Sequence, residues 1–203
     1  MHNSGEQRRI DPSKSNIIDV YILTSTYDNE YRNYVSQNLS DEPLPPTSSS
    51  LEQNYGSYLG EIKAVSDEVI FHPVKYKKLF GSRANIQLQA TFKAVRNNNL
   101  VTNDNNLKNK ILSLINDFFN IQNWNFGQSF YFSELATFVM NQLTPEITNF
   151  IIVPKLESPF GSLLEIGCLP DELLISVATI DNIEVIDAIT NVQLQTSANI
   201  ITA

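Results

Sequence analysis

Apolar positions along the chain follow strand and helix periods, and each period predicts an element. Between Ile17 and Leu23 only Asp19 is polar, which predicts a strand over 17–24 that is covered on both faces. Apolar and polar residues alternate between Ile86 and Val95, which predicts a strand with one solvated face. Further strands are expected at 69–76, 150–153, 163–166 and 173–180, and the last two are expected to form a hairpin around the turn 168–171.

Helical spacing of apolar residues is clearest in the second half of the chain. Leu107, Ile111, Leu114 and Ile115 predict an amphipathic helix over 107–119. A second helix is expected over 133–143, with Ser133 as its N-cap and Thr144-Pro145 as its end. Weaker patterns predict helices over 27–37 and 51–65, separated by the Pro- and Ser-rich loop 39–50.

This order of elements predicts an α+β fold. We expect a mixed sheet with helices packed on one face, built on a ferredoxin-like (split βαβ) core between residues 17 and 153 and followed by a C-terminal β-hairpin. An irregular N-terminal segment, 1–16, precedes this module of residues 17–180, and an apolar C-terminal tail, 181–203, follows it. The alternative is two small lobes, 17–80 and 81–180, that separate near Gly81.

Composition and charge narrow the class of protein. The 203 residues are 42% apolar and include 7 Gly, 9 Pro and 1 Cys, which excludes collagen-like, low-complexity and disulfide-stapled chains. With 14 Lys or Arg against 22 Asp or Glu, the formal net charge is −8, the sign opposite to that of a typical nucleic-acid-binding protein. No apolar run approaches the roughly 20 residues that span a bilayer, so no membrane partner is expected.

No group of residues predicts a reactive centre. The two histidines, His2 and His72, are too few for a zinc site, and Cys168 has no histidine nearby to make it a nucleophile. The carboxylate pairs 67–68 and 171–172 are adjacent on extended chain and therefore point to opposite faces. We predict no catalytic, cofactor-binding or metal-binding residue, and we expect no cofactor.

Two further clusters have structural interpretations that we favour. The basic cluster is expected to form a solvated turn or a salt-bridging interface rather than a phosphate site; its members are Lys75, Lys77, Lys78 and Arg83. The aromatic loop is expected to anchor the core rather than to stack on a ligand; its members are Trp124, Phe126, Phe130, Tyr131 and Phe132.

Three segments carry a family resemblance. They are RRIDPSKSNIIDVYILTSTYDNEYRNYV (8–35), VIFHPVKYKKLFG (69–81) and FGQSFYFSELATFVMNQLTP (126–145). They resemble the large baseplate wedge protein of T-even-like contractile phage tails, and the second half is similar, more loosely, to the C-terminal part of the J-like baseplate family. The resemblance covers about 8–188, whereas wedge proteins are much longer, so the chain resembles their C-terminal third. Thr144-Pro145-Glu146 departs from the family where many relatives carry a glycine.

The resemblance implies a structural role and no enzymatic activity. Such a subunit would bind further copies of itself and other wedge subunits, form a ring around the tail hub, and rearrange when the sheath contracts. It would be assembled in the bacterial cytoplasm and reside in the virion, with the tail 181–203 and the aromatic loop as subunit contacts. Two other hypotheses stay open: a small ferredoxin-like ligand-binding or enzymatic domain that uses the aromatic loop as its pocket, and, less favoured, a sheet-face nucleic-acid binder.

Overall fold

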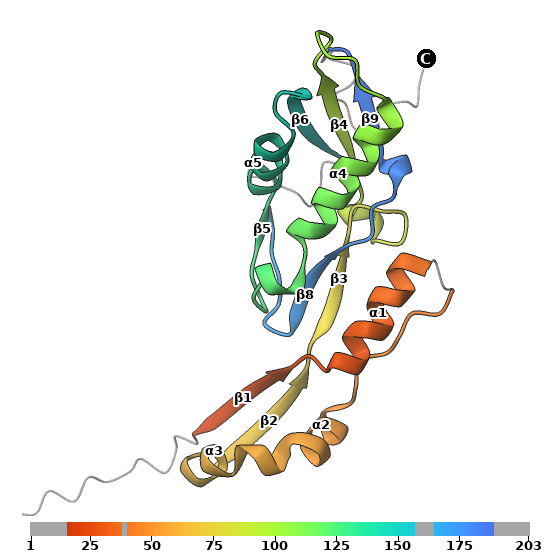
Figure 1. Cartoon of the computed structure of the whole chain (residues 1–203). Helices are drawn as coiled ribbons and strands as arrows, with labels where there is room; N and C mark the ends of the chain where they lie inside the picture. Colours follow the sequence, from red (N-terminus) through yellow and green to blue (C-terminus); the bar gives the residue numbers. More distant parts are fainter. Residues whose placement is uncertain (1–15, 38–39, 157–164, 189–203) are drawn as a thin grey trace, which may run out of the picture. The chain divides into compact units, whose positions relative to one another are not determined.

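The structure, a computed structural model, describes residues 16–37, 40–156 and 165–188 and has a mixed α+β fold (Figure 1). The chain forms two compact units, Met1–Pro73 (unit 1) and Val74–Ala203 (unit 2). The boundary therefore lies between two consecutive strands, ahead of Gly81. The strand expected over 69–76 is accordingly two strands, one in each unit.

Unit 1 is a strand–helix–strand arrangement in which two parallel strands pair with each other. Thr47 caps the second helix, because its hydroxyl accepts a hydrogen bond from the Ser50 N–H at 3.2 Å. The helix expected over 51–65 is interrupted by a 3-10 helix, Gly56–Leu59. The elements of unit 1 are β1 (Ile17–Ile22), α1 (Ser25–Gln37), α2 (Ser48–Tyr55), α3 (Gly60–Val65) and β2 (Glu68–Pro73).

One face of the β1–β2 pair is apolar, and helices pack on its β2 side. The register places Ile18 beside Val69 and Val20 beside Phe71. Phe71 is buried, and the Lys63 ammonium of α3 lies 5.8 Å from its ring centroid. Both α2 and α3 pack against β2, so β2 is the strand that these two helices cover (Figure 1).

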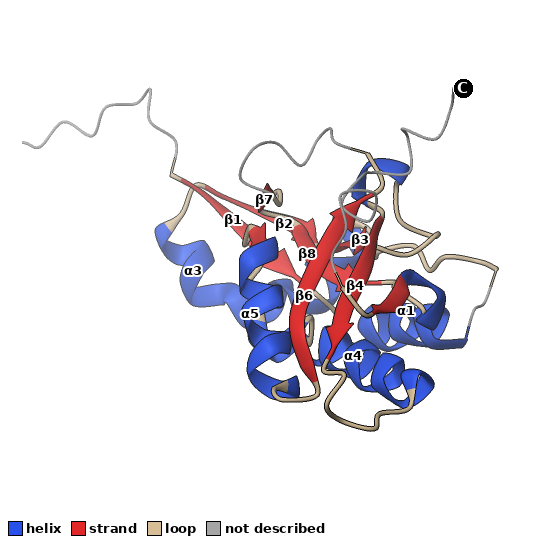
Figure 2. Ribbon diagram, turned by 90° about the horizontal axis from the view of Figure 1, so that it is seen from above, coloured by secondary structure: helices blue, strands red, loops and turns tan. Residues whose placement is uncertain are grey.

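Unit 2 is built around a three-stranded sheet with β4 at its centre (Figure 1), and Figure 2 shows β4 beside β6. β4 (Ala90–Arg96) pairs antiparallel with β6 (Ile147–Pro154) and parallel with β9 (Ile183–Ile186). Helices α4 (Asp104–Phe118) and α5 (Phe132–Leu143) pack against each other and against this sheet. Two further ladders are β3 (Lys75–Leu79) with β8 (Glu172–Ser176), parallel, and β5 (Phe130–Tyr131) with β7 (Glu165–Ile166), antiparallel.

Aromatic rings fill the core of unit 2. Phe80 is fully buried and contacts four other phenylalanine rings at centroid distances of 4.9–6.2 Å. Its φ of 76° is unusual for a residue other than glycine. The four rings belong to Phe92, Phe119, Phe130 and Phe132.

Several expectations from the sequence need correction. The C-terminal hairpin is wrong: β7 pairs with β5, and β8 pairs with β3, because the apolar β8 is buried in the interior of unit 2. A ferredoxin-like core is not confirmed, since among the described strands β1 and β2 pair only with each other and β4 and β6 lie in another ladder. The alternating strand begins at Ala90, because Ile86–Leu88 form a 3-10 turn capped by Asn85.

The C-terminal tail expected over 181–203 begins inside unit 2. Its residues Ile183–Ile186 form β9, for which the sequence pattern predicted no strand. Ile183 is buried beside Phe92 in the sheet, so this part of the expected tail contacts its own unit. The remainder, from 189 onward, and the expected N-terminal segment apart from Asn16 lie outside the described residues.

Candidate functional site

Strand β1 differs most from its sequence-based expectation. Five of its six residues are apolar, which predicted a strand covered on both faces. None of the six is buried, and Ile17 is 45% exposed. Within the described residues, the apolar surface of β1 is therefore only partly covered.

The open face of the β1–β2 pair, defined here as Ile17, Asp19, Tyr21, Glu68, Ile70 and His72, holds a compact polar and aromatic group. These six residues lie beside one another in the parallel register, and each is exposed or half-buried. The His72 Nε2 lies 2.6 Å from the Asp19 Oδ1, and the His72 ring stacks on Tyr21 at 5.0 Å. The sequence contained both members of the Asp19–His72 contact, yet only the register brings them together.

The two adjacent carboxylates Asp67 and Glu68 have different contacts. Asp67 exchanges two hydrogen bonds with Asn16 at the start of the ladder: its Oδ2 accepts from the Asn16 N–H at 2.7 Å, and its own N–H donates to the Asn16 carbonyl at 2.9 Å. Glu68 lies on the open face. The two carboxylates therefore lie in different surroundings, Asp67 on the Asn16 backbone and Glu68 on the open face.

Unit 1 carries most of the net charge. Residues 1–73 contain 5 Lys or Arg and 11 Asp or Glu, so this unit holds −6 of the formal net charge of −8. The acidic residues on or beside the open face include Asp19 and Glu68. This face is therefore set in a negative field that favours cationic groups.

The basic cluster of unit 2 forms intrachain ion pairs, in line with the salt-bridging interpretation. Lys75 lies 3.3 Å from Asp171, and Lys77 lies 3.1 Å from Glu172. The Lys77 ammonium also donates to the Gly167 carbonyl at 2.9 Å. These contacts join β3 to β8 and to the turn before β8. Asp171 and Glu172, the second carboxylate pair of the sequence, therefore contact two different lysines.

The aromatic loop divides into buried anchors and exposed tips. Trp124, Phe130 and Phe132 are at most 8% exposed, and the Trp124 indole N–H donates to the Phe118 carbonyl at 2.7 Å. Phe126 and Tyr131 are 40% and 37% exposed. The prediction that this loop anchors the core is confirmed for the first three, which leaves them unavailable as a ligand-stacking platform.

Cys168 is half-buried, and burial together with the nearby Glu172 carboxylate raises the pKa of its thiol to about 11. The thiol is therefore protonated at neutral pH. The expectation of an inert thiol agrees with this environment.

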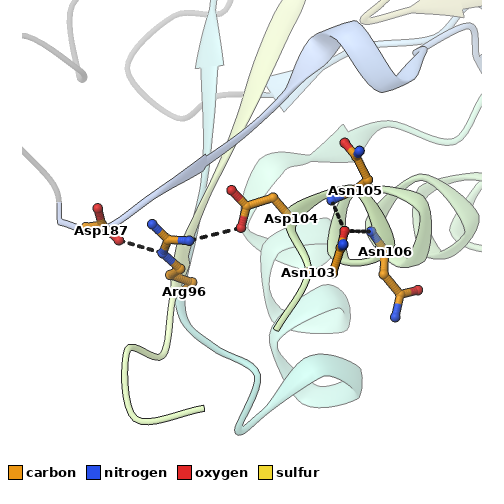
Figure 3. Close-up of polar contacts among 6 residues, drawn as sticks. All are labelled: Arg96, Asn103, Asp104, Asn105, Asn106 and Asp187. Carbon is orange, nitrogen blue, oxygen red and sulfur yellow. Dashed lines mark hydrogen bonds and ion pairs between the residues drawn. The ribbon is translucent and has the colours of Figure 1, made fainter. Parts of the chain in front are cut away.

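A polar network at the C-terminal end of β4, around Arg96, was not predicted from the sequence (Figure 3). Arg96 Nη1 lies 3.1 Å from Asp104 Oδ1, and Arg96 Nε lies 2.5 Å from Asp187 Oδ1. Next to it, the Asn103 side chain caps α4 by accepting from the N–H groups of Asn105 and Asn106 at 2.9 and 3.2 Å. The ion pairs raise the pKa of Arg96 and lower that of Asp187, and they fasten the end of β9 to the start of α4.

Comparison with known proteins adds no assignment, because no family model and no curated protein sequence matches the chain. Among the described residues, no group of three or more His, Cys, Asp or Glu side chains is placed to hold a metal ion. In the same part of the chain, no helix has the length and apolar character needed to cross a membrane. The open face of β1 and β2 is therefore the strongest candidate for a functional surface.

Proposed function

We propose that the chain is a structural subunit of a phage tail baseplate wedge. In this role it contributes to the ring around the tail hub and to the rearrangement that triggers sheath contraction. Its partners are further copies of the wedge protein and other wedge subunits, and its location is the virion. The proposal originates in the resemblance of segments 8–35, 69–81 and 126–145 to wedge proteins.

The structural observation that supports the proposal is the incomplete burial of β1. A strand with five apolar residues out of six, none of them buried, carries apolar surface that a further protein can cover. Assembly subunits bury such surface at interfaces with their neighbours. The two compact units also offer two separate bodies, each able to contact a different neighbour.

The alternative of a small ligand-binding or enzymatic domain placed its pocket at the aromatic loop. That location is occupied by core packing: Trp124 stacks on Phe119 at 5.4 Å, and Phe130 is fully buried. No other observation favours this function. A titration of Trp124 fluorescence with a panel of metabolites is expected to stay flat, and a saturable response would instead support the alternative.

Electron microscopy of contractile tails tests the proposal directly. An antibody raised against the purified chain is bound to tails from the phage that encodes it, and gold label is expected at the baseplate. Label on the capsid or sheath, or no label on tails whose other baseplate proteins are labelled by their own antibodies, contradicts the proposal. Light scattering after size-exclusion chromatography then gives the mass of the purified chain across a range of concentrations.

A further inference from the structure

We propose that the outer edge of β1 accepts an extended segment of a partner protein, with alternating apolar and basic residues, as an additional strand. This inference deepens the proposed function and rests on it, since it names the surface and the chemistry of one subunit contact. Pairing of this kind uses main-chain hydrogen bonds for affinity and alternate side chains for specificity.

The edge of β1 lacks the features that usually block strand pairing. Exposed edges of natural sheets are commonly protected by proline, lysine, a bulge or a covering helix. β1 contains no proline or lysine, and its register with β2 is continuous from Ile17 to Ile22. Among the described strands it pairs with β2 alone, and α2 and α3 pack against β2.

The size of the sheet supports the same conclusion. Two-stranded sheets are marginal by themselves, and parallel strands are normally covered on both faces. In unit 1 the apolar face is closed over Phe71, but Ile17, Tyr21 and Ile70 on the open face remain exposed or half-buried. A third strand beside β1 would widen the sheet and place further side chains next to Ile17 and Tyr21 on this face.

Charge decides between the possible occupants. A second copy of the chain would bring another unit with a net charge of −6 against the first, and the two would repel each other. A segment with lysine or arginine at alternate positions complements this charge, and its cations would lie near Asp19 and Glu68. Its apolar residues would contact the exposed Ile17 and the half-buried Tyr21.

Model peptides test the edge with the full chain. The probe is an end-blocked, fluorescein-labelled peptide of alternating lysine and valine, and its control replaces every lysine with glutamate. In fluorescence anisotropy at low salt, the lysine peptide is expected to bind about tenfold or more tightly than the glutamate peptide, with a difference that shrinks as salt is added. Hydrogen exchange of the complex is expected to slow at residues 17–22.

Two lysine variants, one on the edge strand and one on unit 2, locate the contact. Ile17→Lys adds a cation to the edge and is expected to weaken binding of the lysine peptide by about tenfold or more. Val101→Lys makes the same kind of change on a fully exposed residue of unit 2 and is expected to leave binding unchanged. Circular dichroism verifies that both variants keep the fold of the parent chain.

Distinct outcomes overturn the proposal. These are equal binding of both peptides, no binding of either, exchange protection outside 17–22, or equal loss of binding in both variants. Protection of 17–22 in a dimer of the chain itself assigns the edge to a second copy instead. None of these results depends on labelling of tails, so failure of the edge proposal leaves the baseplate proposal standing, and the two failures are read from different experiments.

Discussion

Replacing Gly81 with alanine places a methyl group against the backbone that follows β8. The added Cβ would overlap the Val177 carbonyl oxygen and lie 2.5 Å from the Val177 carbonyl carbon and 3.1 Å from the Ala178 nitrogen. Comfortable contacts between carbon atoms begin at about 3.5 Å, so the backbone at Val177 must move by at least roughly 1 Å. Main-chain atoms have no alternative rotamer that would relieve this overlap.

The displacement has a cost that can be worked out from the local hydrogen bond. The Val177 N–H donates to the Leu79 carbonyl at 3.0 Å, and a shift of about 1 Å takes this pair beyond hydrogen-bond range. Its loss costs about 1 kcal/mol, and overpacking of the junction adds about 1–3 kcal/mol. The free energy of unfolding of unit 2 is therefore expected to fall by about 2–4 kcal/mol.

Urea unfolding followed by Trp124 fluorescence measures this change, because Trp124 is the single tryptophan and lies buried in unit 2. The midpoint for Gly81→Ala is expected about 1–2 M below that of the parent chain. Gly167→Ala is the matched control, since its Cβ meets no atom within 4 Å, and it is expected to stay within about 0.5 kcal/mol. Equal midpoints for Gly81→Ala and the parent chain would refute the close approach of these two segments.

Three other perturbations follow from the same structure. Phe130→Ala removes a fully buried ring and is expected to lower the free energy of unfolding by about 3–5 kcal/mol in the same urea assay, against no change for alanine at an exposed position. Carbon-13 NMR is expected to show the Asp187 carboxyl titrating below its usual pKa, and Arg96→Gln is expected to return it to that value. Because the folded pKa is lowered, the contribution of this ion pair is present above the unfolded pKa and is lost as the pH falls through the folded one; an unchanged titration in Arg96→Gln contradicts the pairing. The Cys168 thiol, with a pKa of about 11, is expected to react slowly with iodoacetamide at pH 7, and Glu172→Gln is expected to speed the reaction; rapid alkylation of the parent chain counts against its half-buried environment.

Local periodicity predicted the helices of unit 2 well. Apolar residues such as Leu107, Ile111 and Ile115 share one side of α4 at a spacing set by the helix itself, and all three are buried. The aromatic anchors were predicted for a similar reason, since a loop with large rings beside two amphipathic helices can bury them only against those helices. These inferences needed no knowledge of distant segments.

Strand pairing shows the opposite case. The sequence pattern predicted that β7 and β8 pair with each other. In the structure β8 pairs with β3, so that Lys75 lies beside Glu172, a residue far from it in sequence. The Asp19–His72 and Arg96–Asp187 contacts likewise join residues far apart in sequence. No local feature distinguishes Asp19 as the partner of His72, because many other acidic residues were available.

The sequence by itself determined the α+β class, the amphipathic helices, the buried aromatic anchors Trp124, Phe130 and Phe132, and the acidic balance of the chain. Those properties depend on periods of two or 3.6 residues and on composition, which neighbouring residues specify directly. Only the tertiary structure decided which strands pair, where the two units meet in the sequence, and that β1 keeps an open edge. An apolar strand has the same sequence pattern whether its second face is covered by its own chain or left for another protein to cover.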